Sequence, residues 1–357
     1  MTNAPWLVRS VGMYTALGED RASSCAALRS GMGALALTKR FPLMGPDPEW
    51  DPPEPIRVAR APKLPLDLAP RERLEQMLLP AISEAMRAAG IRRADLPQTA
   101  LLLALPSGDE ASAAWALEGF ADEIARRAGL SDLAAVEQRA NGHATVIELL
   151  HRACELITEA RARRVVVAAA DTYVAGDRVR ALDAQGRLAS RRSPQGFSVG
   201  EAGVALVIER AGVTTGAKDA SGRPLARLAA FGFGHEPDSF HSDRAPIGKG
   251  TEAAVLGAMG GFAEGRPVEW LLSDMNGEPY RAMDWGAAVT RLGGRLSEEL
   301  EHGHPADSLG DVGCAAGALL SAIAADALAE RRAPADHAII LTASDAGARA
   351  AMRLEPV

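Results

Sequence analysis

Two glycine-bearing turns, each followed by a long helical pattern, hold the residue types best suited to chemistry. One turn is Asn141-Gly-His-Ala-Thr145, with His143 at its centre, and the other is Gly313-Cys-Ala-Ala-Gly317, which contains Cys314. The amino end of a helix carries a partial positive charge, which disfavours an imidazolium there. A carboxylate within about 4–6 Å of the imidazole would outweigh that effect. The acidic neighbours therefore decide what His143 can do.

The three cysteines suggest packing rather than chemistry. Cys25, Cys154 and Cys314 cannot close a disulfide framework, and none has the spacing of a metal site. Cys314 follows Asp311 closely, and that carboxylate would raise the pKa of the thiol. We expect all three to be reduced core residues of a cytoplasmic protein.

The pair His302-Gly-His304 has a spacing that metal ligands can have, but no third ligand is spaced nearby. A surface loop is the commoner context for such a pair. The sequence therefore predicts no metal site and no cofactor.

The elements around the two turns follow one another in the same order. The first turn leads into a helical pattern over 148–161, an apolar run over 165–170 and Asp171 in an acidic turn. The second leads into a helical pattern over 318–332, an apolar run over 338–343 and Asp345. Each block is typical of a buried helix followed by a buried strand.

The repetition extends upstream of both blocks. Apolar segments at 99–104 and 268–272 follow helical patterns over 71–90 and 250–265, and strand-like segments at 6–14 and 226–233 precede those. The order predicts an α/β fold with two halves, 1–210 and 211–357, whose parallel-type strands are covered on both faces. Chance similarity between generic α/β segments remains the alternative. The proline-rich segment 40–65 is predicted to be an extended surface loop, and 212–224 a linker.

Composition excludes several classes of function. The 357 residues carry 46 acidic and 39 basic side chains, a net charge of −7, and no predominantly basic stretch supports a nucleic-acid partner. The longest apolar run, 314–325, is too short to span a membrane, and the first 20 residues do not resemble a signal peptide.

Four stretches resemble the thiolase superfamily, specifically the β-ketoacyl-[acyl carrier protein] synthases. They are the opening strand and helix over 11–34, the apolar run before Asp171, the block Arg187–Glu209 and the turn Leu309–Ala318. The block over 187–209 is similar to the family's "DGFVxGEGAGxLVLE" segment and is the most specific of the four. The resemblance implies a duplicated thiolase-like fold of five layers, αβαβα. It also implies that Phe197 and Glu201 shape an inner strand and a pocket wall.

The family's catalytic residues are all substituted. The resemblance places His143 at the position of the acylated cysteine, and Asp274 and Asp311 at the positions of the two histidines. A carboxylate is repulsive where an oxyanion must form, and an imidazole does not form a stable thioester. The "GFGGTN" loop is replaced by Thr342-Ala-Ser-Asp-Ala-Gly347. Condensation by the family mechanism is therefore not expected.

Two interpretations of His143, Asp274 and Asp311 stay open. They form a new site, either an acid–base pair or a metal site, or a decayed pocket in which a histidine is held by carboxylates. In both cases we expect His143 to lie within direct or water-bridged hydrogen-bond reach of at least one aspartate, and Asp311 to cap the helix that follows it. The two turn-linked helices should be buried side by side.

The favoured function is a non-condensing protein that binds an acyl carrier protein, a synthase partner or a secreted effector. The alternative is an acyltransferase or thioester hydrolase built on His143, Asp274 and Asp311. A third possibility is a condensing enzyme that uses Cys154 or Cys314. The resemblance implies a homodimer, or a heterodimer with a synthase, in contact near the strand before Asp171.

Overall fold

The computed structural model describes residues 6–44, 52–107, 112, 114–212 and 222–357. Its elements between residues 6 and 210 include, in chain order, β1 (Trp6–Thr15), α1 (Arg21–Arg29), β2 (Ala36–Leu43), β3 (Glu54–Ala59), α2 (Pro70–Ala88), η1 (Arg93–Gln98), β4 (Thr99–Ala104), α4 (Phe120–Arg127), β5 (Ala135–Arg139), η2 (Gly142–Ala144), α5 (Thr145–Thr158), β6 (Arg164–Thr172), α6 (Gly176–Ala184) and β7 (Val199–Arg210).

The second part of the chain contains β8 (Ala226–His235), α7 (Lys249–Ala258), β9 (Val268–Ser273), α8 (Pro279–Leu292), η3 (Gly293–Arg295), β10 (Leu296–Gly303), α9 (Ala306–Leu309), η4 (Gly313–Ala315), α10 (Ala316–Ala329), β11 (Ala338–Ala343) and β12 (Ala348–Glu355). No helix in the described residues is long and apolar enough to cross a bilayer.

The strands of the two parts are arranged in the same order. The order β5-β4-β6-β7-β1 in the first part matches β10-β9-β11-β12-β8 in the second. The two parts join where β1 pairs with β8 over a short antiparallel stretch, from Trp6 opposite Leu228 to Val8 opposite Ala226. The division of the chain into halves at residue 210 stays a prediction, and this shared order supports it.

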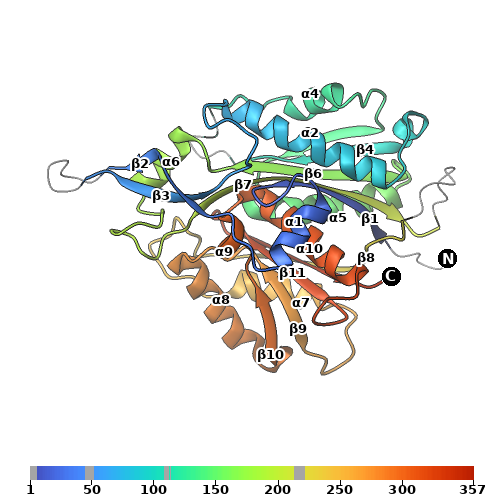
Figure 1. Ribbon diagram of the computed structural model, residues 1–357. Helices are drawn as coiled ribbons and strands as arrows, with labels where there is room; N and C mark the ends of the chain where they lie inside the picture. The colour runs from blue at the N-terminus through green and yellow to red at the C-terminus, as the bar shows by residue number, and fades with distance from the viewer. Residues whose placement is uncertain (1–5, 45–51, 108–111, 113, 213–221) are drawn as a thin grey trace.

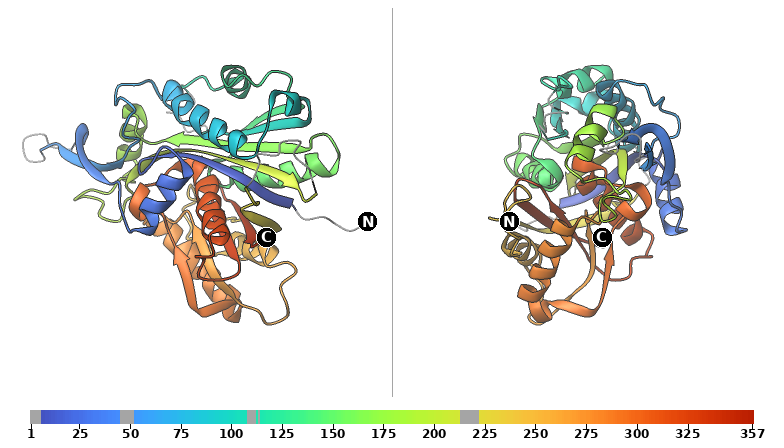
Figure 2. Two further views of the ribbon diagram at one scale, coloured as in Figure 1. Left: turned by 45° about the vertical axis from the view of Figure 1, so that its right-hand side comes forward. Right: turned by 90° about the vertical axis from the view of Figure 1, so that its left-hand side faces the viewer.

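The helices and the sheet form five layers, with α2 and α4 on one outside, α7 and α8 on the other, and α5 and α10 in the middle (Figures 1 and 2). Side-chain alternation along the central strands explains the layering. In β6, Val165 and Val167 pack into the middle layer, whereas Val166 and Ala168 pack under α2 and α4. The expected α/β fold of five layers is confirmed.

Two glycines at matching places let an outer helix approach its strand closely. Gly12 is the seventh residue of β1 and Gly232 the seventh of β8. A Cβ on Gly12 would lie 2.0 Å from the carbonyl oxygen of Ala81 in α2, and one on Gly232 would lie 1.9 Å from that of Ala254 in α7. No side chain fits at either place.

Three expectations about local structure are wrong. The segment 40–65 is not wholly a loop, because it includes the end of β2 and all of β3, which form a hairpin that extends from the body (Figure 1); residues 45–51 lie outside the described part. The strands are not all parallel, because β7 pairs antiparallel with both β1 and β6. Asp171 lies within β6 and not in a turn.

The expected dimer contact near the strand before Asp171 stays a prediction, but that strand cannot itself pair with a partner. That strand, β6, lies between β4 and β7 and is buried along its whole length. It offers no open edge to a partner.

Candidate functional site

The candidate site lies where several elements end. His143 lies in η2, between β5 and α5, and Asp311 directly precedes η4 and α10. Asp274 follows β9, and Asp345 follows β11. The amino ends of α5 and α10 lie close together, because a Cβ on Gly317 would lie 3.0 Å from Cβ of Val146. The expectation that these helices are buried side by side is confirmed.

His143 and Asp311 form a buried ion pair. Nε2 of His143 donates to Oδ1 of Asp311 at 3.0 Å, and their side chains are 6% and 3% exposed. The same oxygen accepts the backbone N–H of Gly313 at 2.7 Å, so Asp311 also caps the start of η4. Both the predicted reach of His143 to an aspartate and the predicted cap are confirmed.

Asp274 reaches His143 only through Arg281, a residue that the sequence did not reveal. Nη1 of Arg281 donates to Oδ2 of Asp274 at 3.1 Å, and Nη2 lies 3.5 Å from both ring nitrogens of His143. Nη2 also donates to Oδ1 of Asp345 at 3.3 Å. A single guanidinium thus links the histidine to two carboxylates.

A second arginine, Arg187, binds two carboxylates of this network. Arg187 makes a bidentate pair with Glu278 at 2.7 and 2.8 Å and also donates to Asp345 at 2.8 Å. Asn276 donates to Oδ2 of Asp311 at 2.7 Å and to Glu278 at 2.9 Å. These contacts fix every carboxylate near His143 by hydrogen bonds, as buried charges require.

The pKa values follow from this arrangement. Burial lowers the pKa of His143, but the carboxylate of Asp311 raises it more than the guanidinium of Arg281 opposes, so the net shift is upward. Burial raises the pKa of Asp311, but His143 and Arg281 hold it well below its usual range. The pair therefore favours an imidazolium beside a carboxylate.

A second carboxylate supports the turn at Cys314. Oδ2 of Asp171 accepts the backbone N–H of Cys314 at 2.9 Å, and its other oxygen pairs with Arg178. Burial, and next the charge of Asp171, raise the pKa of the Cys314 thiol well above its ordinary value. The expected rise in the pKa of Cys314 is confirmed, but burial is its largest cause, and the carboxylate that adds to it is Asp171 and not Asp311.

The other cysteines are core residues, as predicted. Burial raises the pKa of both Cys25 and Cys154 to about 12. Phe197 is buried just before β7, and Glu201, within β7, forms a fully buried salt bridge with Arg73. That the two residues shape a pocket wall stays a prediction.

His302 is not in a surface loop, which corrects the expectation for that pair. It lies in β10, where Nε2 forms a 2.8 Å hydrogen bond with Ser273 Oγ and the ring contacts that of Trp285 in a tilted arrangement. Burial lowers the pKa of His302 to about 4, so the imidazole is neutral at physiological pH.

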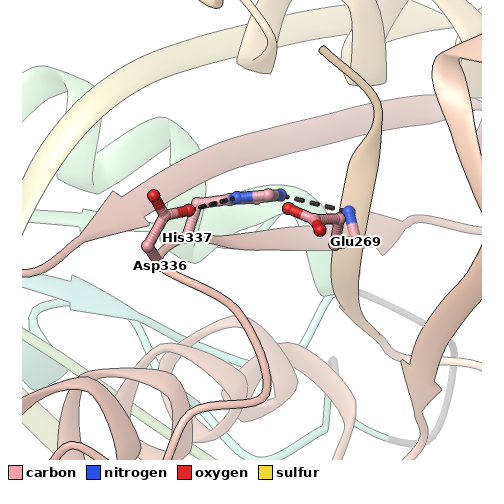
Figure 3. A group of neighbouring side chains, drawn as sticks. All are labelled: Glu269, Asp336 and His337. Carbon is pink, nitrogen blue, oxygen red and sulfur yellow. Dashed lines mark hydrogen bonds and ion pairs between the residues drawn. The ribbon is translucent and has the colours of Figure 1, made fainter.

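The group Glu269, Asp336 and His337 brings three potential metal ligands together (Figure 3). Nε2 of His337 accepts the backbone N–H of Glu269 at 3.2 Å, and Nδ1 lies 3.1 Å from Oδ1 of Asp336. Both ring nitrogens are therefore occupied, and the guanidinium of Arg266 also binds Asp336. These contacts favour a structural role for the group.

The space next to the candidate site is small. A cavity of about 20 Å³ is lined by Asp274, Arg281, Asp284, Ser273 and Trp285, among others. Such a volume holds about one water molecule. Oδ1 of Asp284 is buried without a protein partner and is suited to bind that water.

Sequence reasoning missed Arg187, Asn276, Glu278, Arg281 and Ser344. Ser344 Oγ accepts the N–H of Ala144 at 3.0 Å and donates to the carbonyl of Asn141 at 2.6 Å, so it fixes the turn that carries His143. Two of the five, Asn276 and Glu278, lie in the turn between β9 and α8, where polar residues at a strand end were the available signal. Arg281 lies inside α8 and gives no such signal.

No family model matches the chain, and no curated protein matches it in sequence. Solved structures do match it. A complex of a type II polyketide synthase acyl-carrier protein with its ketosynthase bound to the hexaketide, AntDE:AntF, aligns at a TM-score of 0.80 and 16% identity, over 100% of both chains.

Two further matches come from related assemblies. A complex of the ketosynthase ApeO with its chain length factor ApeC from Xenorhabdus doucetiae gives a TM-score of 0.77 and 13% identity, over 99% of this chain and 98% of that one. A ketosynthase from the bacillaene synthase of Bacillus subtilis 168 gives 0.74 and 12%, over 99% of this chain and 72% of that one. The chain thus has the thiolase-like fold of ketosynthases.

Proposed function

We propose that the chain is a non-condensing, ketosynthase-like protein that acts by binding, as the partner subunit of an active synthase. The observation that carries the proposal is the buried ion pair of His143 and Asp311. The resemblance assigns to His143 the position at which the family needs a thiolate. An imidazolium hydrogen-bonded to a carboxylate is neither a nucleophile nor a base.

The two other positions support the same conclusion. Asp274 and Asp311 stand where the resemblance calls for donors to an enolate oxygen, and their charges would repel that oxygen. Arg281 does not replace the missing donors, because Asp274, Asp345 and the carbonyl of Ala343 already accept from it. The cavity beside Asp274 and Arg281, of about 20 Å³, is too small to hold an acyl chain.

A partner needs a surface, and the open sheet edges provide one. In the described residues β5 and β10 end the sheet, and no strand pairs with their outer sides. The edge strand β10 carries Glu298, Glu299 and Glu301, and charged side chains on an edge strand oppose further pairing. The edge strand β5 begins with Ala135 and Val136, its two charged residues, Glu137 and Arg139, have opposite signs, and it is the edge we assign to the partner.

The absence of condensation can be tested by mass spectrometry of the intact chain after incubation with acyl- and malonyl-loaded acyl carrier protein. We expect no acyl adduct on Cys25, Cys154 or Cys314, which are all at most 4% exposed, and no release of CO₂. An adduct on any of the three, or CO₂ release above a no-protein control, would contradict the proposal. The variant His143→Cys reports whether a thiol at that position is reachable.

The partner edge can be tested with two substitutions at Gln138. The carbonyl of Arg139 accepts the N–H of Leu105, so the N–H of the preceding residue, Gln138, points away from β4. Gln138→Pro removes that outward N–H, while Gln138→Ala removes the same side chain and keeps it. Each variant is co-expressed with a synthase that has the Cys-His-His set, and light scattering measures whether the two proteins form a complex. We expect only the proline variant to lose the complex. Circular dichroism checks that both variants fold.

A second candidate function remains, an acyltransferase or thioester hydrolase at His143, Asp274 and Asp311. The 3.0 Å hydrogen bond favours it, because a carboxylate that orients a histidine is common in such enzymes. Turnover of an acyl-thioester panel by the wild type, lost in His143→Ala without loss of folding, would establish it in place of the binding role.

A further inference from the structure

We propose that an open groove on the outer layer, at the ends of α2 and α4, binds an acidic amphipathic helix of a partner protein. Two adjoining depressions form the groove, with volumes of about 730 and 670 Å³. They share Met86, Ile91, Arg92 and Leu130, so they are continuous. The inference goes beyond the proposed function, because it concerns a helix seated in this groove and not a strand paired with β5, although Val136 of β5 lines the groove.

The floor of the groove is apolar and partly open to solvent. Leu79, Ile91, Leu133 and Val136 line it and pack on the outer core while remaining partly exposed. Apolar side chains held at the bottom of an open depression are typical of a surface that is covered by a partner.

The rim of the groove is basic. Five arginines line the two depressions, against two aspartates. The five are Arg87, Arg92, Arg93, Arg126 and Arg127, and the aspartates are Asp122 and Asp132. This concentration stands out on a chain whose net charge is −7.

Local needs account for only part of this charge. Arg87, Arg126 and Arg127 lie in the last turns of α2 and α4, where a cation interacts favourably with the helix end. Arg127 is also paired with Glu75 at 2.5 Å. Arg93 begins η1 and is exposed, so neither explanation covers it.

The shape and chemistry together identify the occupant. A small ligand buries most of its surface in a closed pocket, whereas this groove is open and lies along the ends of α2 and α4. A helix laid in a groove offers an apolar face to the floor and places its flanking residues at the rim. Glutamate or aspartate on those flanks complements the arginines.

The probe is a designed helical peptide with leucine at i, i+3, i+4 and i+7 and glutamate elsewhere. Its binding to the full chain is measured by fluorescence anisotropy. Arg93→Glu combined with Arg126→Glu should weaken binding roughly tenfold, because two attractions become repulsions. Lys39→Glu combined with Arg40→Glu makes the same charge change on exposed residues of β2 and should leave binding unchanged.

Three outcomes would overturn the proposal. They are no saturable binding of the peptide, equal binding of a scrambled peptide of the same composition, and tighter binding of a single-stranded oligonucleotide than of the peptide. The experiment uses neither a carrier protein nor a synthase, so its result is independent of the function proposed above.

Discussion

Burial lowers the pKa of His143 and the charge of Asp311 raises it, and the net shift is upward. The folded-state pKa of His143 is therefore above its ordinary value of 6.5. A group with a raised folded pKa contributes stability that is complete below its unfolded pKa and is lost as pH rises through the folded pKa. Urea unfolding of the wild type should thus show a falling free energy above pH 6.5.

The variant His143→Ala should lack that slope, because the titrating group is gone. His151→Ala, on the exposed side of α5, is the matched control and should keep the slope. Urea midpoints followed by circular dichroism between pH 6 and 9 provide the measurement. An unchanged slope in His143→Ala would show that another group titrates.

Asp311 should make the stability of the protein depend on pH in the acid range. Its folded pKa lies below the ordinary 3.8, so its contribution is present above that value and is lost as pH falls through the folded pKa. Asp311→Asn should lower the free energy of unfolding at pH 7 by about 3–5 kcal/mol, because His143 and Arg281 lose a buried partner. The difference from the wild type should narrow as pH falls below 3.8. Equal stability of the two proteins at pH 7 would contradict the account.

Arg281 should be as critical as the residues that the sequence identified. Arg281→Met leaves Asp274 and Asp345 without a shared buried cation and should cost about 3–5 kcal/mol in the free energy of unfolding. Adding Asp274→Asn should recover part of that loss, because one unpaired carboxylate is removed. A double variant no more stable than Arg281→Met would show that the two residues are not coupled.

At the scale of elements, the glycines at matching places in β1 and β8 allow the sharpest test of how closely the outer helices pack on the strands. Gly232→Ala should destabilise the protein by about 3 kcal/mol, because its Cβ would lie 1.9 Å from the oxygen of Ala254. Gly286→Ala, in α8 with open space at its Cβ, should be neutral or stabilise by about 0.5–1 kcal/mol. Thermal denaturation compares the two, and a Gly232→Ala variant as stable as Gly286→Ala would refute the close approach.

The sequence predicted the repeating elements better than their neighbours. Strands such as β4 and β11 are short apolar runs between helical patterns. Such strands can be recognised in a sequence because both of their faces are buried, so nearly every residue is apolar. The hairpin of β2 and β3 was missed because its prolines and exposed positions suggest a loop, although a strand at the side of a fold tolerates both. The antiparallel pairing of β7 depends on contacts distant in sequence, which periodicity does not report.

The candidate site was predictable only in part, for a related reason. His143 and Asp311 lie at helix starts within repeated blocks, so their positions followed from the pattern. Arg281 lies inside α8, and nothing in a helical pattern tells an inward arginine from a surface one. Its role depends on where α8 packs, which is a property of the whole fold.

For the whole molecule, the shared middle layer predicts one cooperative unfolding transition. The largest core cluster combines α5, α10 and strands from both parts of the chain, so neither part buries its inner face alone. Scanning calorimetry should give equal calorimetric and van't Hoff enthalpies. Two resolved transitions, or an independently folded fragment 1–210, would contradict this prediction.

The difference between the two ends of the sheet limits how many copies or partners can join. When a neighbour pairs with β5 of this chain, β10 at the opposite end of the sheet still faces outward. Glu298, Glu299 and Glu301 on β10 then oppose pairing with a third member. A fibre requires two receptive ends on each unit, and the acidic side chains on β10 oppose pairing at one end of the described sheet. If a partner pairs with β5 as proposed above, these three glutamates would limit the assembly to a pair.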